Sequence, residues 1–266
     1  MEVSIVPGAW MDVSKLSFKT LLLLERVQLS WFPGWVPEED LAQALKANPA
    51  VEWYIRHKCP EIETWLNWIM TQAPRRPGLK TTRQAEIAVL ESIDDLVVYI
   101  TNPAAYDAQP FLNWDSQELT DTVDFADKVV IDVGAGTGRL ALVAAEKART
   151  VYAVEPAGSL RDYLRQKAGK LGLCNFFVMD GLITSLPFPE RFADITMGGH
   201  VFGDAPENEY NELVRVTRPG GMILLCPGNS DQDSPAHKFL VSRDFSWSRF
   251  EEPRDGWKRK YWKKVK

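Results

Sequence analysis

Residues 129–138, Val-Val-Ile-Asp-Val-Gly-Ala-Gly-Thr-Gly, constrain the fold more than any other part of the sequence. The first five are mostly apolar and β-branched, which is typical of a strand buried on both faces of a parallel sheet. Three alternate glycines follow at once, and Arg139–Ala148 then reads as a helix. A glycine turn between a strand and a helix lets a ligand approach the backbone, because glycine has no Cβ and accepts positive φ. We therefore predict a binding site for a nucleotide-like ligand in an α/β fold.

The acid inside this strand narrows the choice of ligand. A dinucleotide site reads G-x-G-x-x-G and places a pyrophosphate at the helix N-terminus. Here Gly138 comes one residue early, and Asp132 would repel a pyrophosphate but favour an ammonium group. S-adenosylmethionine has a nucleoside part, a positive charge and no phosphate, so it fits this site. An NAD-dependent oxidoreductase is the less favoured alternative.

The next strands also end in polar residues. Thr150–Val154 is followed by Glu155, about 20 residues beyond the glycine turn, where an acid can accept hydrogen bonds from both ribose hydroxyls. Phe176–Met179 ends at Asp180, whose carboxylate can accept the adenine amino group, and the nearby Leu182 is placed to pack on the adenine. We expect further strands and helices in alternation, over Gly158–Lys170, Ala193–Met197, Glu207–Val216 and Gly220–Leu225.

These motifs together resemble the class I S-adenosylmethionine-dependent methyltransferases, and among them the group that includes the ubiquinone and menaquinone C-methyltransferases. The resemblance covers roughly residues 105–266 and depends on Ile131–Gly138, Glu155, Asp180-Gly181 and the segment Glu212–Gly221. It implies a Rossmann-like, seven-stranded, mostly parallel sheet with an antiparallel C-terminal hairpin, for which Phe245–Glu252 and Trp257–Val265 are placed to supply the last two strands. It also implies S-adenosylmethionine as cofactor, S-adenosylhomocysteine as product, and no metal.

The predicted cofactor-binding residues lie at these strand ends and in the segment before the glycine strand: Asp132, Gly134, Ala135, Gly136, Gly138, Glu155, Pro156, Asp180, Gly181, Leu182, Gly198, Tyr106 and Trp114. Tyr106 and Trp114 could offer π-faces to the sulfonium, or they could belong to a packed connecting segment. In the resembled family the position of Met197–Asp204 faces the methyl group. His200 is the only group there that titrates near neutral pH, so it is the candidate general base, with a strand cap or a cofactor contact as the alternative.

The first hundred residues lack this alternation of strands and helices. Helical patterns cover Val13–Ser30, Glu38–Ala47, Ala50–His57, Ile62–Thr71 and Thr82–Ile100, with a breaker-rich stretch at Pro74–Gly78. We place the boundary there: residues 1–78 form a helical cap or substrate region, and residues 79–266 form the methyltransferase domain. The clustered tryptophans of this region are expected to be core residues, with a substrate cage as the alternative. Trp31 and Trp35 are the least core-like and could form a lid or a partner surface.

Composition and residue spacing weigh against several classes of protein. The net charge of −5 does not suggest the basic surface that nucleic-acid binding normally needs. The three cysteines form no C-x-x-C motif, so neither a metal ribbon nor a disulfide framework is expected. The three histidines are scattered rather than spaced as metal ligands. No apolar run is long enough to span a membrane, so we expect a cytoplasmic protein. The expected acceptor is a small molecule. A methyltransferase acting on protein or RNA and a non-catalytic cofactor-binding protein are the alternatives, and the acceptor atom and the oligomeric state stay open.

Overall fold

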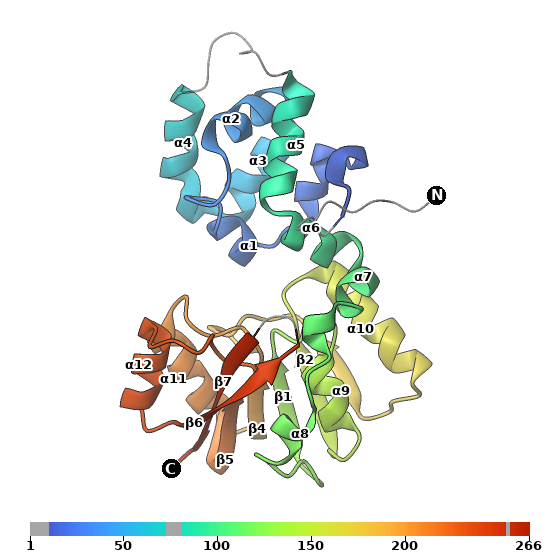
Figure 1. The fold of residues 1–266 in the computed structure, drawn as a ribbon, viewed down its shortest axis with the longest axis vertical. Coiled ribbons are helices and arrows are strands. Elements are labelled where there is room, and N and C mark those ends of the chain that lie inside the picture. The colour runs from blue at the N-terminus through green and yellow to red at the C-terminus, as the bar shows by residue number, and fades with distance from the viewer. Residues whose placement is uncertain (1–10, 73–80, 254–255) are drawn as a thin grey trace. The chain divides into compact units, whose positions relative to one another are not determined.

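The structure is a computed structural model of the 266-residue chain that describes residues 11–72, 81–253 and 256–266. By its internal contacts the chain divides into two units, Met1–Tyr106 and Asp107–Lys266 (Figure 1). This division comes later than residue 78, because helix α5 (Thr82–Ser92) packs on helix α2 (Glu38–Ala47) of the first unit. The stretch Pro74–Gly78, which the sequence suggested as a linker, lies outside the described residues.

The second unit is built on a seven-stranded sheet with the order β3-β2-β1-β4-β5-β7-β6. Strands β1 to β5 are parallel to one another, and β7 runs antiparallel to both of its neighbours. This confirms the Rossmann-like sheet with an antiparallel C-terminal hairpin. The bounds are β1 (Val129–Val133), β2 (Thr150–Val154), β3 (Phe176–Met179), β4 (Ala193–Gly198), β5 (Thr217–Leu225), β6 (Ser246–Glu252) and β7 (Gly256–Lys264).

The strand order reverses between β1 and β4, and this reversal positions the site. In open α/β sheets, ligands bind beyond the carboxyl ends of the strands at such a point. The register places Val133, the last residue of β1, beside Val154 of β2 on one side and Gly198 of β4 on the other. The glycine turn, Glu155 and the loop after Gly198 therefore meet at one edge of the sheet.

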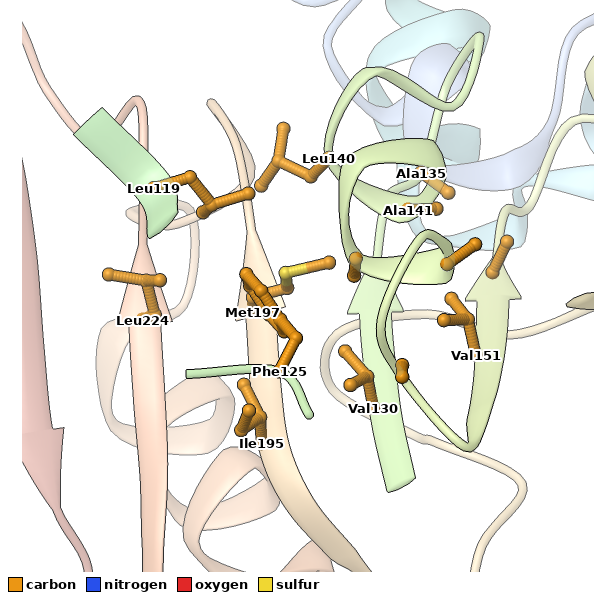
Figure 2. Packing of buried hydrophobic residues seen from close by; sticks show 14 of the residues in the cluster. Leu119, Phe125, Val130, Ala135, Leu140, Ala141, Val151, Ile195, Met197 and Leu224 are labelled. Carbon is orange, nitrogen blue, oxygen red and sulfur yellow. The ribbon is translucent and has the colours of Figure 1, made fainter. Parts of the chain in front are cut away.

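Helices cover both faces of this sheet. On one face, α9 (Arg139–Ala145) packs on β1 and β2, and α10 (Gly158–Lys170) packs on β3. Figure 2 shows part of the core between this face and α9, where Ile195 and Met197 are 2% and 0% exposed. Burying side chains of this size stabilises the fold by about 1.5–3 kcal/mol each. The opposite face is covered by α11 (Pro206–Val216), which packs on β4 and β5, and by α12 (Pro235–Ser242), which the sequence did not predict.

The first unit, Met1–Tyr106, is helical, and from here on we call it the helical unit. Its helices differ from the sequence prediction in two places. The predicted helix over Val13–Ser30 is wrong: Ser17 caps a 3₁₀ helix through Lys19 N–H, and Glu25 forms a capping box that starts a separate helix. The predicted helix over Thr82–Ile100 breaks at Ile93, after which two acids favour a new helix N-terminus. The elements are η1 (Val13–Lys15), η2 (Phe18–Leu23), α1 (Arg26–Ser30), α2, α3 (Pro49–Lys58), η3 (Pro60–Ile62), α4 (Glu63–Gln72), α5, α6 (Asp94–Thr101) and α7 (Pro103–Asp107).

Several tryptophans of this unit face outward rather than inward. The exposed fractions are 61% for Trp53 and 51% for Trp68, so the expectation of core tryptophans is wrong for these two. Trp35, one of the two that the sequence marked as least core-like, is 42% exposed. The interior is filled instead by smaller side chains, such as Leu41 and Ile55. Throughout the described part of the chain, no helix has both the length and the apolar character needed to cross a membrane.

Candidate functional site

The glycine turn after β1 requires glycine for two reasons. Gly134, Gly136 and Gly138 have φ values of 63°, 54° and 91°, a region that other residues rarely adopt. Space is also short, because a Cβ on Gly134 would lie 2.3 Å from Val201 Cγ1, and one on Gly138 would lie 2.8 Å from Leu164 Cδ2. The turn therefore brings bare backbone to the edge of the sheet.

Asp132 lies beneath this turn and is 1% exposed. Its Oδ2 accepts a hydrogen bond of 2.9 Å from the N–H of Ala141, in the first turn of α9. Its Oδ1 is buried and has no hydrogen-bond partner among the described residues. Burial raises the pKa of this carboxyl to about 8 against the lowering effect of the Ala141 hydrogen bond, and the charge of Glu155 adds to the increase. Asp132 thus caps a helix with one oxygen and leaves the other to a donor that the chain does not supply.

This raised pKa predicts how stability depends on pH in the ligand-free protein. Between about pH 4 and pH 8 the folded state holds the Asp132 proton and the unfolded chain does not, so stability falls as the pH rises through this window. Asp132→Asn is neutral at every pH and is expected to remove that slope, which for one proton is at most about 1.4 kcal/mol per pH unit. Urea unfolding of both proteins at several pH values measures the difference. Equal slopes in the two proteins would contradict the buried, protonated carboxyl.

Glu155 follows β2 and is 2% exposed. Its Oε2 accepts from the N–H of Gly136 and its Oε1 from the N–H of Ala157, both at 2.9 Å. The carboxylate thus joins the glycine turn to the start of α10. Because each carboxylate oxygen can accept more than one hydrogen bond, Glu155 can hold these two donors and still accept others.

Asp180 and its neighbours form the side of the site beyond β3. Arg161 of α10, which the sequence analysis missed, lies with Nη1 3.1 Å from Asp180 Oδ1 and also donates to the Glu155 and Pro156 carbonyls. The Asp180 side chain stays 72% exposed. Gly181 must be small because a Cβ there would lie 2.8 Å from Val154 Cγ1, and Leu182 continues into a short bridge with Ser185.

The segment before β1 is held by two cations that the sequence analysis also missed. Arg139, the first residue of α9, donates to the carbonyls of Leu112 and Trp114. Lys167 of α10 donates to Asp107 Oδ2 at 2.6 Å and to the Thr137 carbonyl at 3.1 Å. Arg139 directly follows the last glycine, so its place in the sequence was a usable signal. For Lys167 no such signal existed.

Tyr106 and Trp114 belong to different units of the chain. Tyr106 ends the first unit, where its ring meets Tyr99 edge-on at 4.8 Å between centroids, whereas Trp114 belongs to the second unit. Trp114 is 2% exposed, and the cation over its ring, at 4.7 Å, is the Arg139 guanidinium. The reading of Trp114 as part of a packed segment therefore describes this arrangement better than an open π-face does.

His200 follows β4, two residues beyond Gly198, where a Cβ would lie 2.9 Å from the Val133 carbonyl oxygen. The His200 backbone has a φ of 55°, and its N–H donates to the Pro227 carbonyl at 2.9 Å. Its Nε2 lies 3.2 Å from Oε1 of Glu252, the last residue of β6. Sequence reasoning missed Glu252 because 52 residues separate it from His200. No cluster of three or more potential metal ligands occurs in the described ranges.

Comparison with known proteins finds methyltransferases among those similar to this chain. Residues 131–225 match a family described as a methyltransferase domain. An uncharacterized methyltransferase of Geobacillus thermodenitrificans is 28% identical over 112 residues, which are 41% of this chain and 50% of that protein. The demethylmenaquinone methyltransferase of Thermus thermophilus is 33% identical over 120 residues, 43% of this chain and 53% of that protein. The chain thus spans about half the length of the curated relatives it matches.

Among solved structures, a S-adenosylmethionine-dependent methyltransferase from Aquifex aeolicus superposes with a TM-score of 0.45 at 18% identity, over 62% of this chain and 90% of that one. The family match lies on the strands that carry the glycine turn, Glu155, Asp180 and Gly198. The chain thus combines a match to the methyltransferase-domain family over residues 131–225 with the strand order of the class I S-adenosylmethionine-dependent methyltransferases.

Proposed function

We propose that this protein transfers a methyl group from S-adenosylmethionine to a small-molecule acceptor. The observation that carries the proposal is the Glu155 carboxylate, buried at the end of β2 and bonded to the glycine turn. A carboxylate in this position can accept hydrogen bonds from both hydroxyls of a ribose, and the bare backbone of the turn lets a nucleoside lie against it.

The remaining residues fit the rest of an adenosyl cation. Asp132 has a buried oxygen without a partner in the described structure, and a cationic amino group nearby would stabilise its charged form. Asp180 is exposed beside Gly181, so its carboxylate can accept the adenine amino group while Arg161 holds it in place. Around them we assign backbone contacts to Gly134, Ala135, Gly136, Gly138, Pro156, Gly181 and Gly198, and an apolar contact to Leu182.

When bound, S-adenosylmethionine supplies a methyl group that its sulfonium charge already activates. The protein therefore has to orient an acceptor in line with that methyl group and exclude water, and such alignment can lower the barrier by several kcal/mol. Arg139 and Lys167 contribute by fixing the segment before β1 to the glycine turn and to the start of α9.

A macromolecular acceptor is the second candidate, because one observation favours it. Trp53 and Trp68 are large, apolar and more than half exposed, as the docking residues for another protein often are. The acidic net charge of −5 weighs against RNA. A small molecule is still the better-supported acceptor, because nothing at the strand ends requires a macromolecule.

The test is calorimetric titration of the full chain with S-adenosylmethionine, S-adenosylhomocysteine and NAD⁺. We expect both adenosyl ligands to bind and NAD⁺ not to bind. Binding of NAD⁺ alone would overturn the proposal in favour of an oxidoreductase. A Trp53→Ala/Trp68→Ala variant that keeps small-molecule methylation but loses methylation of proteins would favour the second candidate.

A further inference from the structure

A buried carboxylate from the last hairpin reaches the edge of the sheet where the glycine turn lies. Strand β6 runs antiparallel to β7, which in turn runs antiparallel to β5, so β6 ends at the same edge as β4 and β5. Glu252, the last residue of β6, is 1% exposed and meets the ring of His200, whose side chain is 43% exposed. One end of this pair is therefore fixed in the protein, while the imidazole is open to a ligand.

We propose that Glu252 is a positioning residue that orients His200 as a general base, and that the acceptor atom is a hydroxyl oxygen of a phenol or enol. This inference rests on the proposed methyltransferase function and deepens it by naming the class of acceptor.

The contact between the two side chains selects the tautomer of the ring. Glu252 Oε1 can only accept, and it lies 3.2 Å from His200 Nε2, so the neutral ring carries its hydrogen on Nε2. The lone pair of the ring is then on Nδ1, which has no hydrogen-bond partner among the residues that the structure describes. Nδ1 is therefore the atom that can take a proton from an acceptor.

Two further features hold this geometry. Lys258 Nζ lies 3.6 Å from the other Glu252 oxygen, Oε2, and its side chain is 12% exposed, so the charge of this lysine attracts the carboxylate without a hydrogen bond to it. His200 has a positive φ and a backbone hydrogen bond to the Pro227 carbonyl. A non-glycine residue held in this region costs about 1–3 kcal/mol, and such positions cluster at functional sites.

A base at this point is useful only to an acceptor that has a proton to lose. A tertiary amine or a thioether has none, and a primary amine attacks through its lone pair and loses its proton afterwards. A thiol, with an ordinary pKa of about 8.5, is already partly ionised near neutral pH. A neutral hydroxyl, by contrast, is a poor nucleophile until its proton is removed. In the balanced step, the acceptor oxygen forms a bond to the methyl carbon while the carbon–sulfur bond breaks and its electron pair stays on sulfur. The hydroxyl proton moves to His200 Nδ1, and the Glu252 carboxylate stabilises the imidazolium that results.

The first experiment reads the tautomer without any turnover. The chain has only three histidines, so ¹⁵N-edited NMR of the imidazole rings, with His200→Asn to assign the resonance, resolves His200. With S-adenosylhomocysteine bound and the ring neutral, we expect the Nε2–H form in the wild type and a mixture of tautomers in Glu252→Gln. The matched control is Glu251→Gln, an exposed neighbour on β6, which is expected to leave the tautomer unchanged. An Nδ1–H ring in the wild type, or no change in Glu252→Gln, would overturn the positioning role.

The second experiment tests the acceptor class with catechol, 2-naphthol and acetylacetone as hydroxyl probes, which are mostly neutral at pH 7, and N,N-dimethylaniline as an aprotic one. We expect the wild type to methylate at least one hydroxyl probe, and His200→Asn to lower kcat at pH 7 by about 100-fold or more. Because the probe ionises by itself in alkali, the activity of His200→Asn is expected to recover as the pH rises.

Calorimetry with S-adenosylhomocysteine shows whether a negative result contradicts the proposed function or only the hydroxyl assignment. If the wild type does not bind it, the proposed function fails and the inference with it. If the wild type binds it but methylates only N,N-dimethylaniline, or none of the four probes, the hydroxyl assignment alone is overturned.

Discussion

Replacing Glu155 with alanine is expected to weaken the binding of S-adenosylhomocysteine by about 100-fold or more. The proposed contact is a pair of hydrogen bonds from the ribose hydroxyls to a carboxylate, and each bond to a charged group contributes about 1.5–3 kcal/mol. The loss of both therefore exceeds about 3 kcal/mol, which corresponds to more than two decades in Kd. Calorimetric titration of wild type and variant measures the change.

Two further variants isolate this effect from a change in the fold. Glu155→Gln preserves the volume but puts one NH₂ group where the carboxylate accepted from Gly136 or Ala157, so it is also expected to bind weakly. Glu146→Ala, at an exposed acid after α9, is expected to bind like the wild type. Thermal unfolding shows whether the Glu155 variants are folded. A folded Glu155→Ala protein with wild-type affinity would contradict the role of this residue.

The parts of the candidate site whose positions could be predicted from the sequence are those set by local pattern. The apolar run of β1 and the glycines after it lie next to one another in the chain, so their geometry follows from residue type alone. The position of Glu155 could be predicted in the same way, because an acid at the end of the next parallel strand has to lie beside the turn. The last two strands were placed by the family resemblance, which the antiparallel pairing confirms.

The parts that were missed depend on contacts between distant segments. Nothing in the sequence near Glu252 indicates that β6 ends beside the loop after β4, and the pairing with His200 appears only once the whole sheet is formed. For Trp114 the sequence left two readings open, a π-face for a ligand cation or a packed segment, and it could not show that the Arg139 guanidinium lies over the ring. In the helical unit, apolar periodicity was correct for α2, yet it could not show that the caps at Ser17 and Glu25 divide the preceding stretch.

Gly134→Ala is the variant that most directly tests the glycine turn, and Gly172→Ala is its matched control. The two glycines have nearly the same φ, +63° and +66°, so alanine is strained by about 1–2 kcal/mol at either position. Only Gly134 is crowded, with Val201 Cγ1 2.3 Å from the new Cβ, whereas nothing lies within 4 Å of a Cβ on Gly172. Comparing the two variants therefore separates the strain from the packing.

Val201 cannot easily move away from the new methyl group in Gly134→Ala. It is β-branched and stiff at χ1, and its other methyl group, Cγ2, already lies against Gly198, 2.7 Å from where a Cβ would stand. We expect Gly134→Ala to lose about 1–3 kcal/mol more stability than Gly172→Ala in urea unfolding, because overpacking adds to the strain.

The same pair of variants is expected to differ in ligand binding. Gly134→Ala shifts the loop that carries His200 and fills the space over the turn, so S-adenosylhomocysteine is expected to bind at least about tenfold more weakly, while Gly172→Ala keeps wild-type affinity. Adding Val201→Ala to Gly134→Ala is expected to restore the packing part of the stability, because it removes the clashing methyl groups, but not the part due to φ. If Gly134→Ala and Gly172→Ala were equal in both stability and affinity, the turn would not be the close-approach site that the geometry indicates.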